Sequence, residues 1–480
     1  MKSKIKYILA SFLMIVFAFI SAGCSDSVYE YAIKQGLDTN VSTSDYLPKD
    51  GIDGRDGKDG DSIDLYSVYS KLVELKQFTG TYAQFVKEYL GIEESEYVAN
   101  SALTSVVSIY SAFTSTITYQ TSPSTTDTFT TKGYSAGSGV IYSINKETGD
   151  ALIITNYHVV YNNSSAPQIS NEINVFLYGN ENFTINTEET FSDGWTTHKY
   201  QNLVSDSKIS ATYLGGSMLY DLAVLKVSGS EIIKNSSATP VYFEDSDSVS
   251  VGETAVAIGN PSAYGISTTK GIVSVDSEYI SMTGVDGVTP CTFRVLRTDA
   301  SINSGNSGGG LFNSDGKLIG IVNAKLNSSS IENIAYAIPS NVVLGVVENI
   351  IRNCDGDTKT SVLRCIMGFY LKALNSSAVS GYDNGKLRTK IVETVSIDSI
   401  TEGSIVEGLL SAGDIITSVK IEYQNGEILN KEITRTFHFI DLSLTLSVGD
   451  KVTIYRTNSA GVQQNPVQVT FTSDHVVEYK

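Results

Sequence analysis

The segment that decides the fold is TDASINSGNSGGGLF, residues 298–312. Its serine, Ser307, follows Gly305 and Asn306 and precedes three further glycines. A serine among glycines is either part of a flexible turn or an exposed nucleophile. Glycines allow a tight turn that directs the amides of Gly305 and Ser307 toward one point, as a tetrahedral oxyanion requires. Ser307 is therefore a candidate nucleophile, and these two amides are candidate oxyanion-hole donors.

A serine hydroxyl is a weak nucleophile, so it needs a base and a carboxylate that orients the base. The chain has four histidines, His158, His198, His438 and His475. His158 directly follows the apolar run of ALIITNYHVV, whereas His198 lies in a polar stretch and the other two lie near the C-terminus. Asp221 immediately precedes the apolar run LAVLKV. The residues thus favour His158 and Asp221, although a lone histidine is more often structural.

Residues 101–350 contain short apolar runs separated by Gly, Asn, Asp and Ser, among them SVVSIYS, ALIITN, LAVLKV and TAVAIG. Repeated short strands with turn residues between them indicate an all-β barrel or sandwich. The segment is long enough for two small barrels. We expect a mainly β fold.

Six motifs occur in order: GSGVIYS, LIITNYHVV, LYDLAVLKV, TAVAIGNPSAYGISTTKGIVS, RTDASINSGNSGGGLFNSDGKLIGIVNA and IAYAIPSN. Together they resemble the trypsin-like double β-barrel and, within that fold, the HtrA (Deg) family of envelope quality-control proteases. The resemblance implies a protease domain over residues 100–350, with His158 as general base, Asp221 as its orienting carboxylate and Ser307 as nucleophile. It also implies an oxyanion hole formed by the Gly305 and Ser307 amides, and no cofactor or metal.

The resemblance extends to the specificity pocket. At some positions, however, the sequence departs from the pattern of the family. Six residues before the nucleophile, at the base of that pocket in this fold, stands Ser301 rather than an aspartate. A basic substrate side chain would lack a buried counter-charge, so we expect cleavage after small or medium apolar residues. Ser304 and Gly310 replace frequent prolines. The insertion at residues 178–207 is interpreted as a surface loop, with a regulatory or oligomer contact as the alternative.

The C-terminal residues 366–480 resemble a PDZ domain, most clearly in the stretch GSIVEGLLSAGDII. Such a domain binds an extended peptide C-terminus as an added strand. By alignment, Met367, Gly368 and Phe369 form the loop that would hold the peptide carboxylate. Ser404, Ile405 and Val406 replace the usual small-residue and proline pattern, which makes the fold a firmer expectation than the binding.

The N-terminal sequence MKSKIKYILASFLMIVFAFISAGC carries lysines, an apolar run and small residues before Cys24. The run is short for a membrane-spanning helix, so we expect a cleaved export signal over residues 1–23. SAGC resembles a bacterial lipobox, which implies lipidation of Cys24. Residues 24–61 include glycine at every third position of GIDGRDGKDGDS and are predicted to form a flexible spacer with collagen-like triplets. Residues 62–91 show helical spacing and predict a small helical module.

Composition excludes some functions. The net charge is −18, from 34 basic and 52 acidic residues, and this repels phosphate backbones, so no nucleic-acid partner is expected. Apart from Cys24, the cysteines are Cys291, Cys354 and Cys365, which are not spaced as metal ligands. A Cys354–Cys365 bridge and two unpaired thiols both remain open.

These features predict an exported serine endopeptidase, anchored by lipid to the cell membrane and facing the extracellular side or a periplasm. Its expected substrates are unfolded or misfolded exported proteins. The family resemblance further implies a homo-trimer. Two alternatives stay open: a PDZ-bearing chaperone or surface binding protein with an inactive protease fold, and a processing protease for a single substrate.

Overall fold

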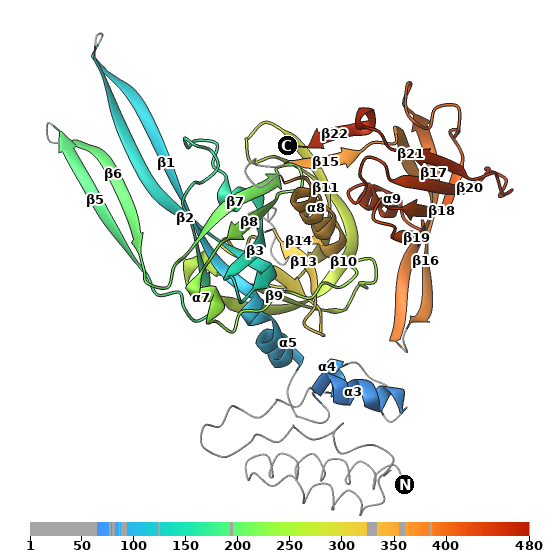
Figure 1. The fold of residues 1–480 in the computed structure, drawn as a ribbon, viewed down its shortest axis with the longest axis horizontal. Helices are drawn as coiled ribbons and strands as arrows, with labels where there is room; N and C mark the ends of the chain where they lie inside the picture. Colours follow the sequence, from blue (N-terminus) through green and yellow to red (C-terminus); the bar gives the residue numbers. More distant parts are fainter. Residues whose placement is uncertain are drawn as a thin grey trace, which may run out of the picture. The chain divides into compact units, whose positions relative to one another are not determined.

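The structure is a computed structural model. It describes residues 65–75, 78, 82–85, 87, 94–122, 125–192, 195–323, 334–354, 361–383 and 386–479. The chain divides into two compact units, Met1–Tyr97 and Val98–Lys480 (Figure 1). The predicted export signal, Cys24 and the glycine-rich spacer lie outside the described residues. Within the described ranges, no helix is both long enough and apolar enough to cross a bilayer.

The described part of the first unit is helical. It contains α3 (Leu65–Glu74), α4 (Tyr82–Phe85) and the start of α5 (Glu94–Ala102). A hydrophobic cluster joins them, made of Leu72, Phe78 and Phe85 with Tyr69, Tyr82 and Tyr97 packed against these three. Phe85 is fully buried, and the rings of Tyr82 and Phe85 stack at 5.9 Å. This small core explains why the apolar residues recur at helical spacing.

The second unit begins with a ring of six strands. These are β1 (Val106–Ser122), β4 (Ile173–Leu177), β7 (Ile209–Ser217), β8 (Leu222–Val227), β3 (Asp150–Thr155) and β2 (Thr125–Asn145), and a β1–β2 pairing closes the ring. Its interior is filled by aliphatic side chains such as Ile109, Ile153 and Leu225, which are at most 1% exposed. The alternating apolar runs of the sequence therefore face inward, as in a closed barrel.

A second, closed barrel follows. Its strands, in spatial order, are β10 (Ser267–Thr283), β11 (Pro290–Thr298), β14 (Ala335–Pro339), β13 (Leu318–Val322), β12 (Gly310–Phe312) and β9 (Thr254–Gly259). Val273, Leu296 and Leu311 are fully buried in its core. The segment that contains Ser307 connects β11 to β12. Two barrels joined in this way give the mainly β architecture that the sequence predicts.

The insertion at residues 178–207 lies at the surface, as interpreted, but it forms an ordered β-hairpin rather than an irregular loop. Its strands are β5 (Thr184–Ser192) and β6 (Trp195–Val204), and β6 pairs in parallel with β2, for example His198 with Thr130. Threonine-rich alternation in both partners suits strand formation, because β-branched side chains pack well on a pleated surface. Together with the outer half of β1–β2, this hairpin projects from the first barrel (Figure 1).

The remaining residues form a second β-rich part. Its main sheet has the order β16 (Phe369–Asp383), β17 (Lys386–Ile400), β18 (Ile415–Glu422), β20 (Lys451–Thr457) and β21 (Val467–Thr470), and β19 (Ile428–Glu432) pairs with β18. Helix α9 (Thr436–Leu442) lies beside β16. Val395, Ile397 and Phe471 belong to its separate apolar core. A short two-stranded sheet joins β15 (Val362–Cys365) to β22 (Val476–Tyr479).

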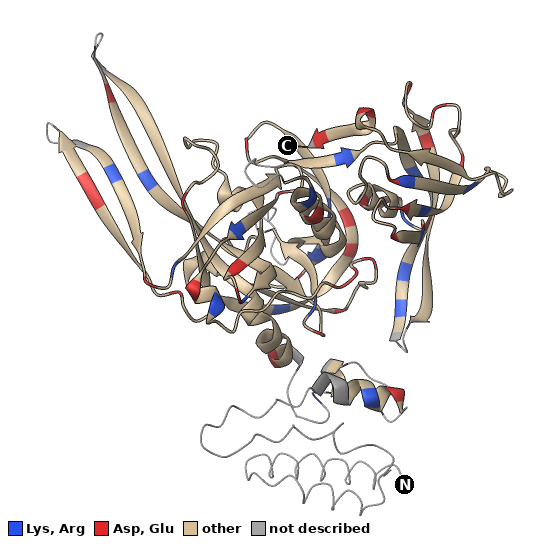
Figure 2. Ribbon diagram, viewed as in Figure 1, with Lys and Arg blue, Asp and Glu red and all other residues tan. Residues whose placement is uncertain are grey.

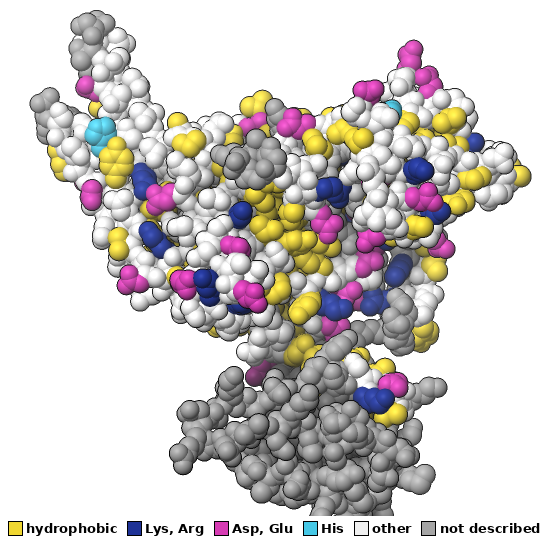
Figure 3. All heavy atoms as spheres, viewed as in Figure 1, with side chains coloured by type: hydrophobic (Ala, Val, Ile, Leu, Met, Phe, Trp, Pro, Cys, Tyr) yellow, Lys and Arg dark blue, Asp and Glu magenta, His cyan; other side chains and the backbone are white. Residues whose placement is uncertain are grey.

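Helix α8 (Ser340–Asn353) joins the second barrel to this C-terminal part. The amide of Asn349, fully buried on α8, donates to the carbonyls of Leu363 at 2.6 Å and Leu444 at 3.0 Å. The side-chain oxygen of Asn349, Oδ1, accepts from the backbone amide of Leu363 at 2.8 Å. Figure 3 shows apolar side chains gathering on the surface around the position of α8.

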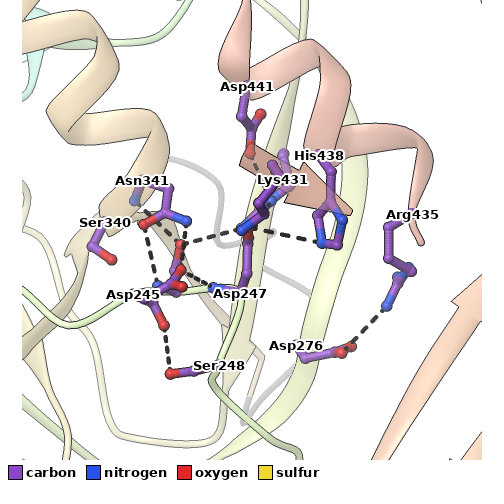
Figure 4. A network of polar contacts seen from close by, with 12 residues as sticks. Asp245, Asp247, Ser248, Asp276, Ser340, Asn341, Lys431, Arg435, His438 and Asp441 are labelled. Carbon is purple, nitrogen blue, oxygen red and sulfur yellow. Dashed lines mark hydrogen bonds and ion pairs between the residues drawn. The ribbon is translucent and has the colours of Figure 1, made fainter. Parts of the chain in front are cut away.

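A polar network also links the second barrel to the C-terminal part (Figure 4). Arg294 on β11 is 2% exposed and contacts Asp247 at 3.2 Å and Asp441 of α9 at 2.6 Å. Its guanidinium lies 3.9 Å from the ring centroid of Phe437. Lys431 contacts the other oxygen of Asp247 at 2.8 Å. Elsewhere, acidic and basic residues are interspersed along the strands, helices and loops (Figure 2).

Candidate active site

His158 is held by a single helical turn at the end of β3. This turn, α6 (Tyr157–Val160), buries Val159 and Val160 in the first barrel and leaves the His158 side chain 19% exposed. Nδ1 of His158 lies 2.7 Å from Oδ2 of Asp221. Because a carboxylate accepts hydrogen bonds, this contact places a proton on Nδ1 and leaves Nε2 as the acceptor. That is the tautomer a general base needs.

Asp221 has an unusual backbone for a non-glycine residue, with φ of 50°, in the left-handed region. Such a conformation costs about 1–3 kcal/mol and persists where the surroundings enforce it. Here Oδ1 accepts from the backbone amide of His158 at 2.9 Å, and the Asp221 carbonyl accepts from the Asn156 side chain at 2.9 Å. The Asn323 amide donates to Oδ2 at 2.9 Å. With Nδ1 of His158, the His158 amide and the Asn323 side chain give the carboxylate three donors, while Asn156 holds the Asp221 backbone.

The sequence interpretation missed Asn156 and Asn323. Both are fully buried polar residues. Asn156 lies in the segment TNYHVV, beside His158, and Asn323 lies in GIVNA, after an apolar run. The available signal was an asparagine at the end of an apolar strand, where a polar side chain needs a buried partner.

Ser307 lies in a tight loop that contacts the first barrel. The carbonyl of Ser307 accepts from the Ser138 amide at 2.8 Å, and the Gly308 amide donates to the Val322 carbonyl at 3.0 Å. A Cβ atom at Gly308 would lie 2.1 Å from the Ser138 carbonyl oxygen and 2.3 Å from Oγ1 of Thr155. The loop therefore packs against the end of β3, and His158 follows Thr155 by three residues.

Gly305 takes a backbone conformation that only glycine adopts easily, with φ of 98°. A Cβ there would lie 2.2 Å from the Asn260 carbonyl oxygen. The preceding carbonyl, that of Ser304, accepts from the Ser262 amide at 2.7 Å. Because the peptide is planar and trans, the Gly305 N–H points to the side opposite Ser262.

Ser301 lies before this loop, and its carbonyl accepts from Oγ1 of Thr269 at 2.8 Å. The side chain of Ser301 is exposed, while the next residue, Ile302, is buried. Residues 324–333, which follow β13, are outside the described residues. The role of Ser301 in specificity remains a prediction.

Tyrosines next to His158 stay uncharged. Burial raises the pKa of Tyr157 to about 12, and burial likewise raises the pKa of Tyr213, whose ring lies 6.3 Å from that of Tyr157. The ring of Tyr161 stacks on Tyr157 at 5.3 Å. Tyr157, the residue before His158, therefore carries no charge, and Asp221 supplies the negative charge that contacts the imidazole.

The residues Met367, Gly368 and Phe369 form a separate candidate site at the start of β16. Gly368 has φ of 77°, and its carbonyl accepts from the Thr401 amide at 2.7 Å. The Phe369 ring lies 5.0 Å from the ring of Phe439 on α9. Since β16 is the outermost strand of its sheet, one of its edges has no strand partner within the described residues.

Among the described residues, no group of three or more His, Cys, Asp or Glu side chains is arranged to hold a metal ion. Cys354 and Cys365 carry free thiols. Burial raises the pKa of the Cys365 thiol to about 11, so it stays protonated and unreactive.

Residues 137–321 match the family described as the trypsin-like peptidase domain. The match spans less than half of the chain. His158, Asp221 and Ser307 all lie within the matched range, and the mainly β, trypsin-like fold expected from the sequence is confirmed.

The chain is also similar to named bacterial serine proteases. One is a serine protease Do-like HtrA of Lactococcus lactis subsp. lactis (strain IL1403), 34% identical over 293 residues, which are 59% of this chain and 60% of the relative. Another is the serine protease Do-like HtrA of Bacillus subtilis (strain 168), 34% identical over 291 residues, 59% of this chain and 54% of the relative. The chain thus spans at most about three fifths of these relatives.

Among solved structures, the HtrA-type protease AlgW with decapeptide is 22% identical. The match covers 80% of this chain and 99% of that chain, with a TM-score of 0.44.

Proposed function

We propose that this chain is a serine endopeptidase. The observation that carries the proposal is the contact of 2.7 Å between His158 and Asp221, in the same domain as the glycine-rich loop that holds Ser307. The tautomer set by Asp221 leaves His158 Nε2 able to take a proton from a serine hydroxyl.

The proposed reaction has two halves. Ser307 Oγ attacks the carbonyl carbon of a peptide bond while His158 takes its proton, and the Gly305 and Ser307 amides stabilise the oxyanion. His158 then gives the proton to the leaving amine, so an acyl-enzyme remains. Water, deprotonated by His158, attacks the ester and releases the second product, which restores Ser307. Asp221 orients the imidazole and stabilises its charged form.

For substrates, we propose unfolded or misfolded exported proteins, cleaved after small or medium apolar residues. Ser301 supports this choice, because it provides no carboxylate for a basic side chain. Cleavage-site mapping on reduced, unfolded casein tests it. Cleavage mainly after Lys or Arg would contradict the assignment.

We further propose that the C-terminal part is a PDZ domain that binds peptide C-termini. The outer edge of β16, the positive φ of Gly368 and the neighbouring apolar side chains of Phe369 and Phe439 support this. Titration of the full chain with an apolar C-terminal peptide, and with the same peptide amidated at its C-terminus, would measure it. Equal affinity for both would exclude recognition of a carboxylate.

The cellular setting is also a proposal. The export signal and Cys24 support a lipid-anchored protein on the outer face of the cell membrane, and the resemblance to HtrA proteases supports a homo-trimer. Metabolic labelling with a fatty-acid analogue, with Cys24→Ser as control, tests the anchor. Sedimentation of the purified chain tests the trimer.

A fluorophosphonate probe tests the enzymatic activity directly. Wild type should be labelled and should cleave casein, while Ser307→Ala should do neither. If wild type is not labelled even with unfolded protein and an apolar C-terminal peptide present, the chain is not an active serine hydrolase. A binding protein with an inactive protease fold would then be the better description.

A further inference from the structure

Ser138 connects the first barrel to the loop that holds the proposed nucleophile. It lies on β2, is fully buried, and uses its backbone and its side chain in different contacts. Its amide donates to the Ser307 carbonyl at 2.8 Å. Its carbonyl accepts from Oγ1 of Thr155 at 2.6 Å, at the end of the strand that leads to His158. The backbone of Ser138 thus lies between the two halves of the site.

The hydroxyl of Ser138 makes two further bonds, and their directions are unambiguous. Oγ donates to the Gly305 carbonyl at 2.7 Å and accepts from the Asn260 amide at 2.7 Å. A carbonyl oxygen only accepts and a backbone N–H only donates, so neither partner can exchange roles. The hydroxyl therefore has one orientation, and it restrains the Gly305 carbonyl.

This restraint acts on Gly305, whose backbone is not restricted by a side chain. Glycine has no Cβ and rotates more freely about φ and ψ than any other residue. Gly305 sits at φ of 98°, and its N–H is one of the two proposed oxyanion donors. Holding its carbonyl holds ψ, and the bond from Ser262 to the Ser304 carbonyl holds the peptide on the other side. The Gly305 amide is thereby fixed from both ends.

The packing around Ser138 leaves little room for a different arrangement. A Cβ at Gly259 would lie 2.9 Å from Oγ of Ser138, and a Cβ at Gly308 would lie 2.1 Å from its carbonyl oxygen. Both neighbours are glycines, so the backbone of Gly259 approaches the hydroxyl and that of Gly308 approaches the carbonyl of Ser138 closely. Loss of the hydroxyl leaves the Asn260 amide and the Gly305 carbonyl without this partner in a buried site.

We infer that Ser138 is a positioning residue for catalysis: its hydroxyl aligns the Gly305 amide with the oxyanion. The inference rests on the proposed serine endopeptidase function. Ser138, the first serine of GSGVIYS, thereby gains a role in the reaction. Ser138 does not contact the substrate in this scheme and acts only through Gly305.

The test uses the full chain in four forms: wild type, Ser138→Ala, Ser138→Cys and Ser111→Ala. Cysteine keeps the approximate volume but hydrogen-bonds weakly. Ser111 is the matched control, because it is a fully buried serine of the same barrel, on β1, whose hydroxyl has no hydrogen-bond partner in the described structure. Circular dichroism checks the fold of each form. The readouts are kcat and KM on labelled casein, the rate of fluorophosphonate labelling, and the pH profile of kcat/KM.

We expect kcat to fall about 10- to 100-fold in both Ser138 variants, because a small misplacement of a catalytic group has effects of this size. KM should stay within about two-fold, since the interaction matters only in the transition state. Labelling should slow by a similar factor, because phosphonylation uses the same amides. The acid limb of the pH profile should not move, since Ser138 has no contact with the His158–Asp221 pair. Ser111→Ala should match wild type.

Several results would overturn the inference. These are a kcat near that of wild type in the Ser138 variants, a loss confined to KM, an equal loss in Ser111→Ala, a shifted acid limb, or failure of both Ser138 variants to fold. Wild type that neither labels nor cleaves would instead refute the proposed function itself. That outcome is distinguishable because it does not depend on any Ser138 variant.

Discussion

The side-chain amide of Asn323 lies 2.9 Å from Oδ2 of Asp221, the same oxygen that contacts Nδ1 of His158 at 2.7 Å. Two donors, one from each barrel, thus converge on one carboxylate oxygen. Asn323 follows β13 of the second barrel, while Asp221 precedes β8 of the first. The Asp221 carboxylate is therefore held in part by a residue of the other barrel.

Removing this amide should weaken the orientation of Asp221. For Asn323→Ala we expect kcat to fall about 10-fold, because one hydrogen bond to a charged group contributes about 1.5 kcal/mol or more. Steady-state kinetics on casein would measure it. An unchanged kcat in a folded variant would show that the other donors alone orient the carboxylate.

Asp221→Asn should have a much larger effect. An asparagine can place an amide N–H opposite Nδ1, which moves the proton of His158 to Nε2 and removes the base. We expect kcat to fall by about 10³- to 10⁴-fold, as in other triads with this change. Asp206→Asn, which alters an exposed carboxylate of the same barrel, is the control and should retain activity.

The buried contacts of Arg294 should matter for stability. Arg294→Ala leaves Asp247 and Asp441 without their buried partner, and breaking such a pair typically destabilises by about 3–5 kcal/mol. Arg297→Ala is the control on the same strand, since its pair with Glu278 is 33% and 28% exposed and should contribute at most about 1 kcal/mol. Urea denaturation would compare the two. Equal effects would contradict a dominant role for the buried network.

The network also predicts a pH dependence of stability. Burial lowers the pKa of His438 to about 4, even though Asp247 lies 3.8 Å away and acts in the opposite direction. The unfolded chain takes up a proton on this histidine near pH 6.5, whereas the folded chain does so only near pH 4. Stability should therefore be lost as the pH falls through this window, by about 3 kcal/mol in total.

The measurement is the difference between wild type and His438→Gln, followed by urea denaturation at several pH values between 4 and 7. The glutamine variant should lack this component of the loss, while the titration of other groups, including Asp441, is largely common to both proteins. Parallel pH profiles for the two would show that His438 does not contribute.

The sequence alone determined the chemistry of the candidate site and the class of fold. Ser307 among glycines, His158 after an apolar strand and Asp221 before another are recognisable locally, because the reaction needs those residue types and strands need alternating apolar side chains. These signals depend on residues within a few positions of one another. They can therefore be recognised in the sequence without any knowledge of long-range contacts.

Only the tertiary structure decided the partners. Ser138 and Gly305 are 167 positions apart, and Arg294 and Asp441 are 147 apart. The hairpin formed by β5 and β6 joins the sheet through a parallel pairing with β2 that no turn specifies. In each case a common polar or β-branched residue gains its role from a neighbour brought close by barrel closure and packing. The sequence around such a residue does not predict which distant group it will contact in the folded chain.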